Sequence, residues 1–270
     1  MGLQKLVLLL ISTGSFFAYK TKNDPITNAD KNHNNVTTTL VTQTENADLL
    51  LKKTVSAHGG DLYDTANYSF NFRGDAFYFK NDHKNFEYSK THKKEKNLTQ
   101  DFLKNGVLTR KVNNKTSNLS ENSSKRAKSS LNSVIYFATL PHKLNDEAVN
   151  KTYIGETSIK GENYAILGIT FNKEGGGEDF DDQFHYWINT ETNKIDYLAY
   201  NYKVNGGGVR FRSAFNRRVV DGITFQDYIN YKANPKTPLV DLPKLYEAGE
   251  LKELSKIKTE NVINLNNKQK

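Results

Sequence analysis

Two arginines with aromatic neighbours are the residues of this sequence best suited to bind a ligand. Arg210 and Arg212 are separated by one residue, so on a strand their side chains share one face. On the strand expected just before them, Tyr200 and Tyr202 share a face by the same alternation. An aromatic surface beside paired guanidinium groups could hold an anionic amphiphile. The simpler interpretation, with the arginines on the solvated side of a sheet and the aromatic rings in its core, stays open.

The histidines and one acidic run are further candidates for chemistry. His58 and His185 are the candidates for a polar site, although capping of a helix C-terminus explains His58 more simply than catalysis does. The sequence contains no His-x-x-x-His or His-Glu-x-x-His pair and no Gly-x-Ser-x-Gly motif. Carboxylates over residues 178–182 suit calcium, but their spacing does not match an EF-hand loop, and a solvated turn is the default. We therefore predict no catalytic residues, no metal site and no cofactor.

The first eighteen residues have the features of a secretory signal. Lys5 supplies a basic start, residues 6–11 form an apolar run, and small and apolar residues lead to Ala18. The run is shorter than the roughly 20 residues of a membrane-spanning helix. These features predict an exported protein of the periplasm or cell envelope of a Gram-negative bacterium, associated with the membrane through its N-terminus if the signal is kept. We expect a signal peptide or N-terminal anchor over residues 1–18, a flexible linker over 19–45, a single β domain over 46–265 and a tail over 266–270.

Composition and charge narrow the chemistry further. The chain has no cysteine, which excludes disulfides, zinc-thiolate sites and thiol catalysis. A net charge of +8 is typical of proteins with anionic partners. Because the lysines are spread through Asn-rich sequence, and because the chain is expected to be exported, we predict no binding to nucleic acid.

Apolar periodicity predicts an α+β domain that is mostly β, with two or three helices. Helices are expected over residues 47–58, 125–140 and 245–254, and a last edge strand over 255–265. A polar segment over 113–124 interrupts the pattern. The other strands are expected over residues 68–73, 76–80, 85–90, 96–103, 107–112, 152–155, 164–171, 184–189, 195–204, 209–216 and 223–231. The lack of βαβ repeats argues against a doubly wound sheet or a TIM barrel. The glycine runs at 175–177 and 206–208 join strand to strand, so we expect turns there and no phosphate-binding loop.

The second half of the chain resembles the outer-membrane lipoprotein-sorting, LolA-like superfamily. Residues 184–200 read as a strand, a Trp-Ile-Asn step with a polar turn, and a second strand, and a late strand begins with Gly222-Ile-Thr-Phe225. Over residues 46–265 the chain is still more similar to the DUF6503 family of uncharacterised Bacteroidetes envelope proteins. The chain departs from a lipoprotein in having Tyr19 where the lipidated cysteine would stand.

The resemblance implies an antiparallel unclosed β-barrel, or half-barrel, wrapped around two or three helices, with an apolar cavity for acyl chains. The implied ligand is a lipid or another hydrophobic small molecule. No cavity residue of the superfamily transfers position by position. The candidate ligand-binding residues are therefore chosen from the pattern alone: Arg73, Trp187, Tyr200, Tyr202, Arg210 and Arg212.

Three functions are compatible with these features, and we favour the first. It is a non-enzymatic carrier or binding protein for a hydrophobic ligand. The second is an envelope hydrolase that uses His58 or His185, which requires a histidine, a carboxylate and an arginine to meet in one cleft. The third is a structural or interaction module at the cell surface, whose exposed strand edges pair with an envelope protein partner.

Overall fold

The computed structural model describes residues 30–174, 182–203 and 206–266, and side chains from residue 44 onwards. The chain divides into two units, Met1–Thr38 and Thr39–Lys270. Of the first unit only the helical residues 30–38 are described, and everything below concerns the second. None of the described helices combines the length and the hydropathy that a membrane crossing requires.

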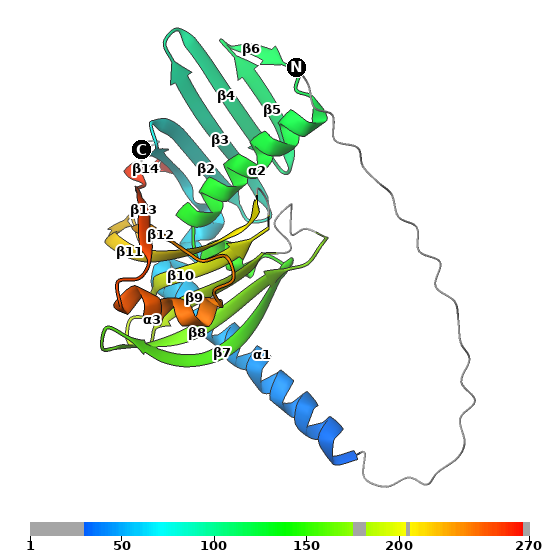
Figure 1. The fold of residues 1–270 in the computed structure, drawn as a ribbon. Helices are drawn as coiled ribbons and strands as arrows, with labels where there is room; N and C mark the ends of the chain where they lie inside the picture. The colour runs from blue at the N-terminus through cyan, green and yellow to red at the C-terminus, as the bar shows by residue number, and fades with distance from the viewer. Residues whose placement is uncertain (1–29, 175–181, 204–205, 267–270) are drawn as a thin grey trace, which may run out of the picture. The chain divides into compact units, whose positions relative to one another are not determined.

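The described elements alternate between long runs of strands and a few helices (Figure 1). In chain order they are α1 (Asp30–His58), η1 (Gly60–Thr65), β1 (Asn67–Phe72), β2 (Asp75–Asp82), β3 (Asn85–Lys94), β4 (Asn97–Lys104), β5 (Val107–Val112), β6 (Lys115–Ser117), α2 (Glu121–Ala138), η2 (His142–Asn145), β7 (Val149–Ile159), β8 (Glu162–Phe171), β9 (Gln183–Asn189), β10 (Ile195–Tyr202), β11 (Gly208–Val220), β12 (Ile223–Ala233), η5 (Leu239–Asp241), α3 (Leu242–Glu247), β13 (Lys252–Ile257) and β14 (Glu260–Asn264).

The strands form two open, seven-stranded antiparallel sheets. Sheet A has the order β14-β1-β2-β3-β4-β5-β6, and sheet B has the order β13-β12-β11-β10-β9-β8-β7. Within each sheet the neighbours are consecutive strands of that sheet along the chain, except that the last strand, β14, pairs with the first strand, β1. The prediction of a mostly β, antiparallel and unclosed fold with two or three helices is therefore confirmed.

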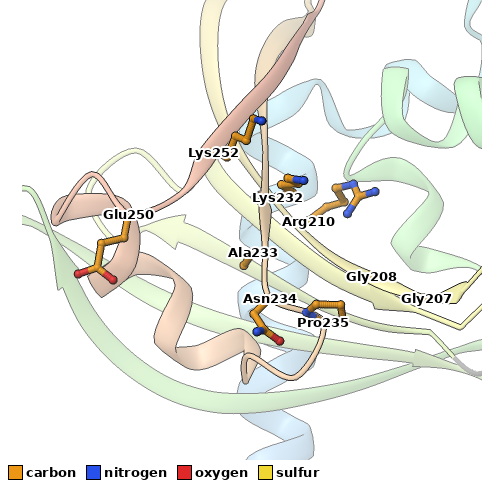
Figure 2. A pocket seen from close by; sticks show the side chains of 9 residues that line it. All are labelled: Gly207, Gly208, Arg210, Lys232, Ala233, Asn234, Pro235, Glu250 and Lys252. Carbon is orange, nitrogen blue, oxygen red and sulfur yellow. The ribbon is translucent and has the colours of Figure 1, made fainter.

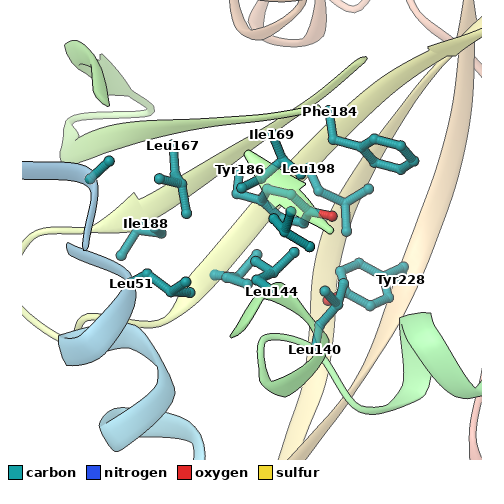
Figure 3. Close-up of a cluster of buried hydrophobic side chains, with 13 residues drawn as sticks. Leu51, Leu140, Leu144, Leu167, Ile169, Phe184, Tyr186, Ile188, Leu198 and Tyr228 are labelled. Carbon is teal, nitrogen blue, oxygen red and sulfur yellow. The ribbon is translucent and has the colours of Figure 1, made fainter. Parts of the chain in front are cut away.

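Sheet B is covered on both faces, because alternate residues of its strands are apolar on each side. On its inner face, Ala47 and Leu51 of α1, together with Leu140 and Leu144, pack against β8, β9 and β10 (Figure 3). On its outer face, Leu239 and the residues of α3 pack against a second set of side chains from the same strands. The inner face is thus filled by helices and their connections, in the place where the predicted acyl-chain cavity would lie.

Sheet A is covered on one face by α2. Leu131 and Ile135 of this helix are fully buried against Phe70 and Phe79 of β1 and β2. Ser120 caps the helix, since its side chain accepts a hydrogen bond from the amide of Ser123 at 3.3 Å. The helix expected over 125–140 therefore exists, and it begins earlier, at the residue that follows this cap.

The C-terminal end of α1 is fixed to sheet B by polar contacts. Lys194 donates to the carbonyl of Ala57 at 2.5 Å and to the hydroxyl of Thr224 at 3.1 Å. The backbone amide of Ile195 donates to Nε2 of His58 at 3.2 Å. Orphan carbonyls at a helix end need such partners. The dipole-capping role expected of His58 is instead carried by the Lys194 ammonium, and the imidazole serves as a buried acceptor.

Several boundaries differ from the sequence-based expectation, and the strand expected over 152–155 is longer, as β7 (Val149–Ile159). α1 begins at Asp30, so residues 30–45 of the predicted linker are helical. No glycine or proline interrupts residues 30–58, and extending an existing helix costs little. The helix expected over 245–254 is shorter and earlier, and Gly249 at a φ of 72° follows its end. The predicted polar break over 113–124 contains a short strand and the start of α2.

The last edge strand expected over 255–265 is in fact two strands in two sheets, β13 and β14. A buried carboxylate fixes the connection between them. Asp227 of β12 is 2% exposed and accepts hydrogen bonds from the amide of Thr259 at 3.0 Å and from Asn216 at 2.8 Å. Arg218 pairs with Asp227 at 3.2 Å and also donates to the carbonyl and hydroxyl of Thr259. This Asp227 cluster therefore holds the chain where it passes from sheet B to sheet A.

Replacing Asp227 by alanine is expected to lower the free energy of unfolding by about 3–5 kcal/mol, because Arg218 would keep a half-buried charge without its partner. Denaturant unfolding of the full chain measures this loss. Glu87→Ala is the matched control, since it breaks an ion pair with Lys104 that is exposed, and the expected loss there is below about 1 kcal/mol. Equal losses in the two variants would contradict a special role for the Asp227 cluster.

His58 is expected to make stability fall as the pH falls. Burial, reinforced by the charges of Lys194 and Arg217, lowers the pKa of His58 from 6.5 to about 3. Between pH 6.5 and pH 3, His58 is therefore protonated in the unfolded chain and neutral in the folded chain. Stability is complete above pH 6.5 and is lost by about 1.4 kcal/mol per pH unit below it.

The measurement is the difference in free energy of unfolding between the wild type and His58→Gln at pH 7, 6 and 5. Glutamine offers an oxygen acceptor to the amide of Ile195 but does not titrate. The variant's disadvantage should shrink by about 2 kcal/mol between pH 7 and pH 5. A difference that stays constant over this range would show that the pKa of His58 in the folded protein equals its pKa in the unfolded chain.

Candidate functional site

Arg212 is a buried cation in an aromatic setting. It lies on the inner face of sheet B, directly opposite Leu198 on β10 and Asn230 on β12, and it is 7% exposed. The guanidinium carbon lies 3.9 Å from the centre of the Phe137 ring, and one nitrogen donates to the hydroxyl of Tyr200 at 2.9 Å. Within the described part of the chain, Arg212 has no carboxylate partner, and its Nε and the neighbouring Oδ1 of Asn230 are buried without any hydrogen bond.

An aromatic cluster extends from Arg212 across the inner face. Ring centres are 5.8 Å apart between Phe137 and Tyr200, 5.2 Å between Tyr200 and Phe184, and 5.6 Å between Phe184 and Phe171. Tyr136 at the end of α2 joins the cluster through its own contact with Phe184. Most of these rings are only partly buried. The cluster therefore gives sheet B an apolar rim, with Arg212 at one end of it.

Arg210 lies beside this rim and shares its face. It is paired with Tyr200 across the strands and donates to the hydroxyl of Tyr202, with its guanidinium carbon 5.0 Å from the centre of that ring. Gly208 makes this arrangement possible. A Cβ at this position would lie 2.6 Å from the Tyr202 hydroxyl and 2.9 Å from Nη1 of Arg210. The structure thus brings together Tyr200, Tyr202, Arg210 and Arg212, the four residues that the alternation pattern had grouped.

A pocket of about 500 Å³ opens next to Arg210, at the ends of β11, β12 and β13 (Figure 2). Figure 2 shows three basic side chains on three neighbouring strands, with Glu250 standing apart from them. The lining consists of Gly207, Gly208, Arg210, Lys232, Ala233, Asn234, Pro235, Glu250 and Lys252. Three cationic groups and one carboxylate leave the pocket with an excess of positive charge.

Arg73 and Trp187 are not part of this site. Arg73 lies in the turn between β1 and β2 of sheet A, with its guanidinium 5.2 Å from the centre of the Phe72 ring. Trp187 is on the outer face of sheet B, 0% exposed and packed against Phe211. Alternation along β9 places Trp187 and Phe184 on opposite faces, so the tryptophan cannot reach a ligand that contacts Arg212.

The two candidate histidines do not form an acid–base pair. His58 is 1% exposed, and its Nε2 is occupied by the amide of Ile195. His185 lies on the outer face beside Trp187, and burial lowers its pKa from 6.5 to about 4. Neither histidine is hydrogen-bonded to a carboxylate in the described ranges. Of the acidic run over 178–182, only Asp182 lies inside the described residues, and these contain no group of three or more potential metal ligands.

Sequence reasoning missed Phe137, Lys232 and Lys252. Phe137 is near the end of α2, and only the tertiary structure brings it over Arg212. The two lysines are placed by strand register, which periodicity along one strand does not determine. Alternation along β12 could have assigned Lys232 and Asn230 to one face, but it could not have identified Arg210 as the cross-strand neighbour.

Arg212→Met is expected to leave the free energy of unfolding unchanged or to raise it by about 1 kcal/mol. Methionine keeps apolar contact with Phe137 and removes a buried charge that has no carboxylate partner in the described ranges. Arg218→Met on the same strand is the control, because it leaves the buried carboxylate of Asp227 without its cationic partner. This variant should lower the free energy of unfolding by about 3 kcal/mol. If denaturant unfolding shows a loss above about 2 kcal/mol for Arg212→Met, the guanidinium is a structural element and no ligand group.

Solved structures with a related arrangement of strands are distant in sequence. A Vibrio parahaemolyticus domain assigned to outer membrane lipoprotein sorting is 6% identical, with 82% of this chain and 93% of that chain covered and a TM-score of 0.47. A LolA superfamily protein from Nitrosomonas europaea is 11% identical, with 80% and 92% covered and a TM-score of 0.45. A DUF1329 family protein from Desulfovibrio piger is 12% identical, with 81% and 93% covered and a TM-score of 0.39. These likenesses concern the arrangement of strands and carry no argument about function.

A comparison with curated proteins finds no match. The model of a family of unknown function, DUF6503, matches residues 52–259. This range includes strands β1 to β13 and every residue of the site on sheet B. The match therefore confirms the resemblance seen in the sequence, and the chain belongs to the DUF6503 family.

Proposed function

We propose that this protein binds and carries an amphiphile with an acidic group at the inner rim of sheet B, without transforming it. The observation that carries the proposal is Arg212, a guanidinium buried among aromatic rings with no carboxylate partner among the described residues. A buried charge without a counter-charge costs stability, so its presence is best explained by a ligand that supplies the counter-charge.

The aromatic rim provides the apolar half of the recognition. Tyr200 and Phe137 contact Arg212 directly, and Phe171 extends the apolar surface towards β8. Because α1 and η2 already fill the deeper part of the inner face, we place the ligand along the rim and not inside a central cavity. Partly exposed rings of this kind offer apolar contact at low cost in conformational entropy.

Export supports the same function. The predicted signal over residues 1–18 directs the chain to the periplasm or cell envelope, where an amphiphile needs a carrier to cross water between membranes. An uncleaved signal would keep the carrier at the membrane surface. The histidine–carboxylate–arginine cleft that a hydrolase would need is not formed by the described residues, so no observation favours that alternative.

The test uses three ligands with one acyl chain: oleate, monoolein and oleoyl lysophosphatidic acid, each below its aggregation concentration. Titration calorimetry of the full chain should give an affinity for oleate at least about tenfold above that for neutral monoolein, because a charge-assisted hydrogen bond contributes about 1.5–3 kcal/mol. Arg212→Met should remove this difference.

Native mass spectrometry of the protein purified gently from its own envelope provides an independent check. A bound acidic lipid, released and identified, would agree with the proposal. If no lipid co-purifies and none of the three ligands binds in the calorimeter, the carrier function is refuted, and an interaction module that pairs through its sheet edges becomes the better explanation.

A further inference from the structure

Three basic residues stand directly opposite one another in sheet B. Arg210 of β11 is paired with Lys232 of β12, and Lys232 is paired with Lys252 of β13. Neighbouring strands are about 4.8 Å apart, so this basic row places three cations within about 10 Å on one face of the sheet. Like charges in directly opposed positions destabilise a sheet. The row therefore costs the free protein stability.

Elsewhere the sheets pair charges of opposite sign. In sheet A, Asp101 is opposite Arg110 with a bond of 2.6 Å, and Glu87 is opposite Lys104. In sheet B, Arg217 and Arg218 each have an aspartate partner. Within the ranges that the structure describes, neither Lys232 nor Lys252 forms an ion pair, and Arg210 bonds to a tyrosine hydroxyl and a backbone carbonyl. The basic row therefore differs from these pairs, because its directly opposed residues carry charges of the same sign.

We infer that the basic row binds a phosphate monoester group, with Arg210, Lys232 and Lys252 as its donors. This inference rests on the proposed function and specifies its ligand: the acidic group of the amphiphile is a phosphate that enters the pocket beside Arg212, which lies two residues from Arg210 on the same face of β11. The acyl chain follows the aromatic rim from Tyr200. Row and rim are continuous, because Tyr200 is the cross-strand neighbour of Arg210.

Charge and geometry favour phosphate over carboxylate. The pocket lining carries three cations and the single carboxylate of Glu250, an excess of two positive charges. A phosphate monoester carries close to two negative charges at pH 7 and has three acceptor oxygens, one for each donor of the row. A carboxylate supplies one charge and two oxygens, which would leave one cation of the row unpaired. Arginine and lysine are both common phosphate ligands in proteins.

The experiment compares oleoyl lysophosphatidic acid with oleate on the full chain and on three variants. Lys232→Gln and Lys252→Gln each remove one cation from an exposed position, where folding is little affected. Lys256→Gln is the matched control, since Lys256 is on the same strand, is exposed, and pairs with Ile229 on the opposite face. The wild type and the control should bind the phosphate lipid about tenfold more tightly than oleate, and the two row variants should bind both equally.

A second readout needs no lipid. At low ionic strength the row variants should have a higher melting temperature than the wild type, because the repulsion is relieved, and the advantage should disappear in 1 M NaCl, where charges are screened within about 3 Å. Inorganic phosphate alone should raise the melting temperature of the wild type and the control but not of the row variants. An equal response of all four proteins would contradict a phosphate site on the row.

The outcomes separate the two proposals. If oleate and the phosphate lipid bind equally well and the row variants change nothing, the phosphate inference is wrong while the carrier function stands. If inorganic phosphate stabilises the wild type through the row but neither lipid binds, the row takes a free phosphate compound, and the carrier function is wrong. If neither lipid nor phosphate interacts with the protein, both proposals are refuted.

Discussion

The buried carboxylate of Asp227 is the constraint on which the two-sheet arrangement depends. It collects donors from the irregular end of β11 and from the connection between β13 and β14, and it does so at a position that is almost inaccessible to water. Edge strands such as these gain their backbone hydrogen bonds on one side only. The carboxylate therefore determines where β13 ends in one sheet and β14 begins in the other, and it connects the two sheets through a single short segment.

Coverage of sheet B on both faces decides where a ligand can go. α1 and its polar anchors at Ala57 and His58 occupy the inner face, and α3 occupies the outer one. Under the proposed function, the surface left for the ligand is the end of the inner face, where aromatic rings are partly exposed and Arg210, Lys232 and Lys252 stand opposite one another. A site of this kind sits on rigid strands, so its side chains are held in place before a ligand arrives, which lowers the entropic cost of binding.

Local pattern predicted local structure well. The strands expected over 96–103 and 107–112, the helix expected over 125–140 and the shared face of Arg210 and Arg212 follow from residue type and alternation. Long-range pairing was beyond such reasoning. The irregularity between Asn230 and Tyr231 sets which residue of β13 meets Lys232, and a shift by one position would turn Lys252 to the other face. The division of residues 255–265 between two sheets was missed for the same reason, because a single distant carboxylate decides it.

The pairing of β14 with β1 has a consequence for how the chain is made. β1 is hydrogen-bonded on one side to β2 and on the other side to β14, which consists of residues 260–264 near the end of the described chain. Contacts so distant in sequence form slowly, because the entropy of closing the intervening chain must be overcome before they contribute. A nascent chain that has not yet reached Glu260 leaves one edge of β1 without hydrogen bonds. Sheet A can therefore reach its full width only after residues 260–264 have been synthesised.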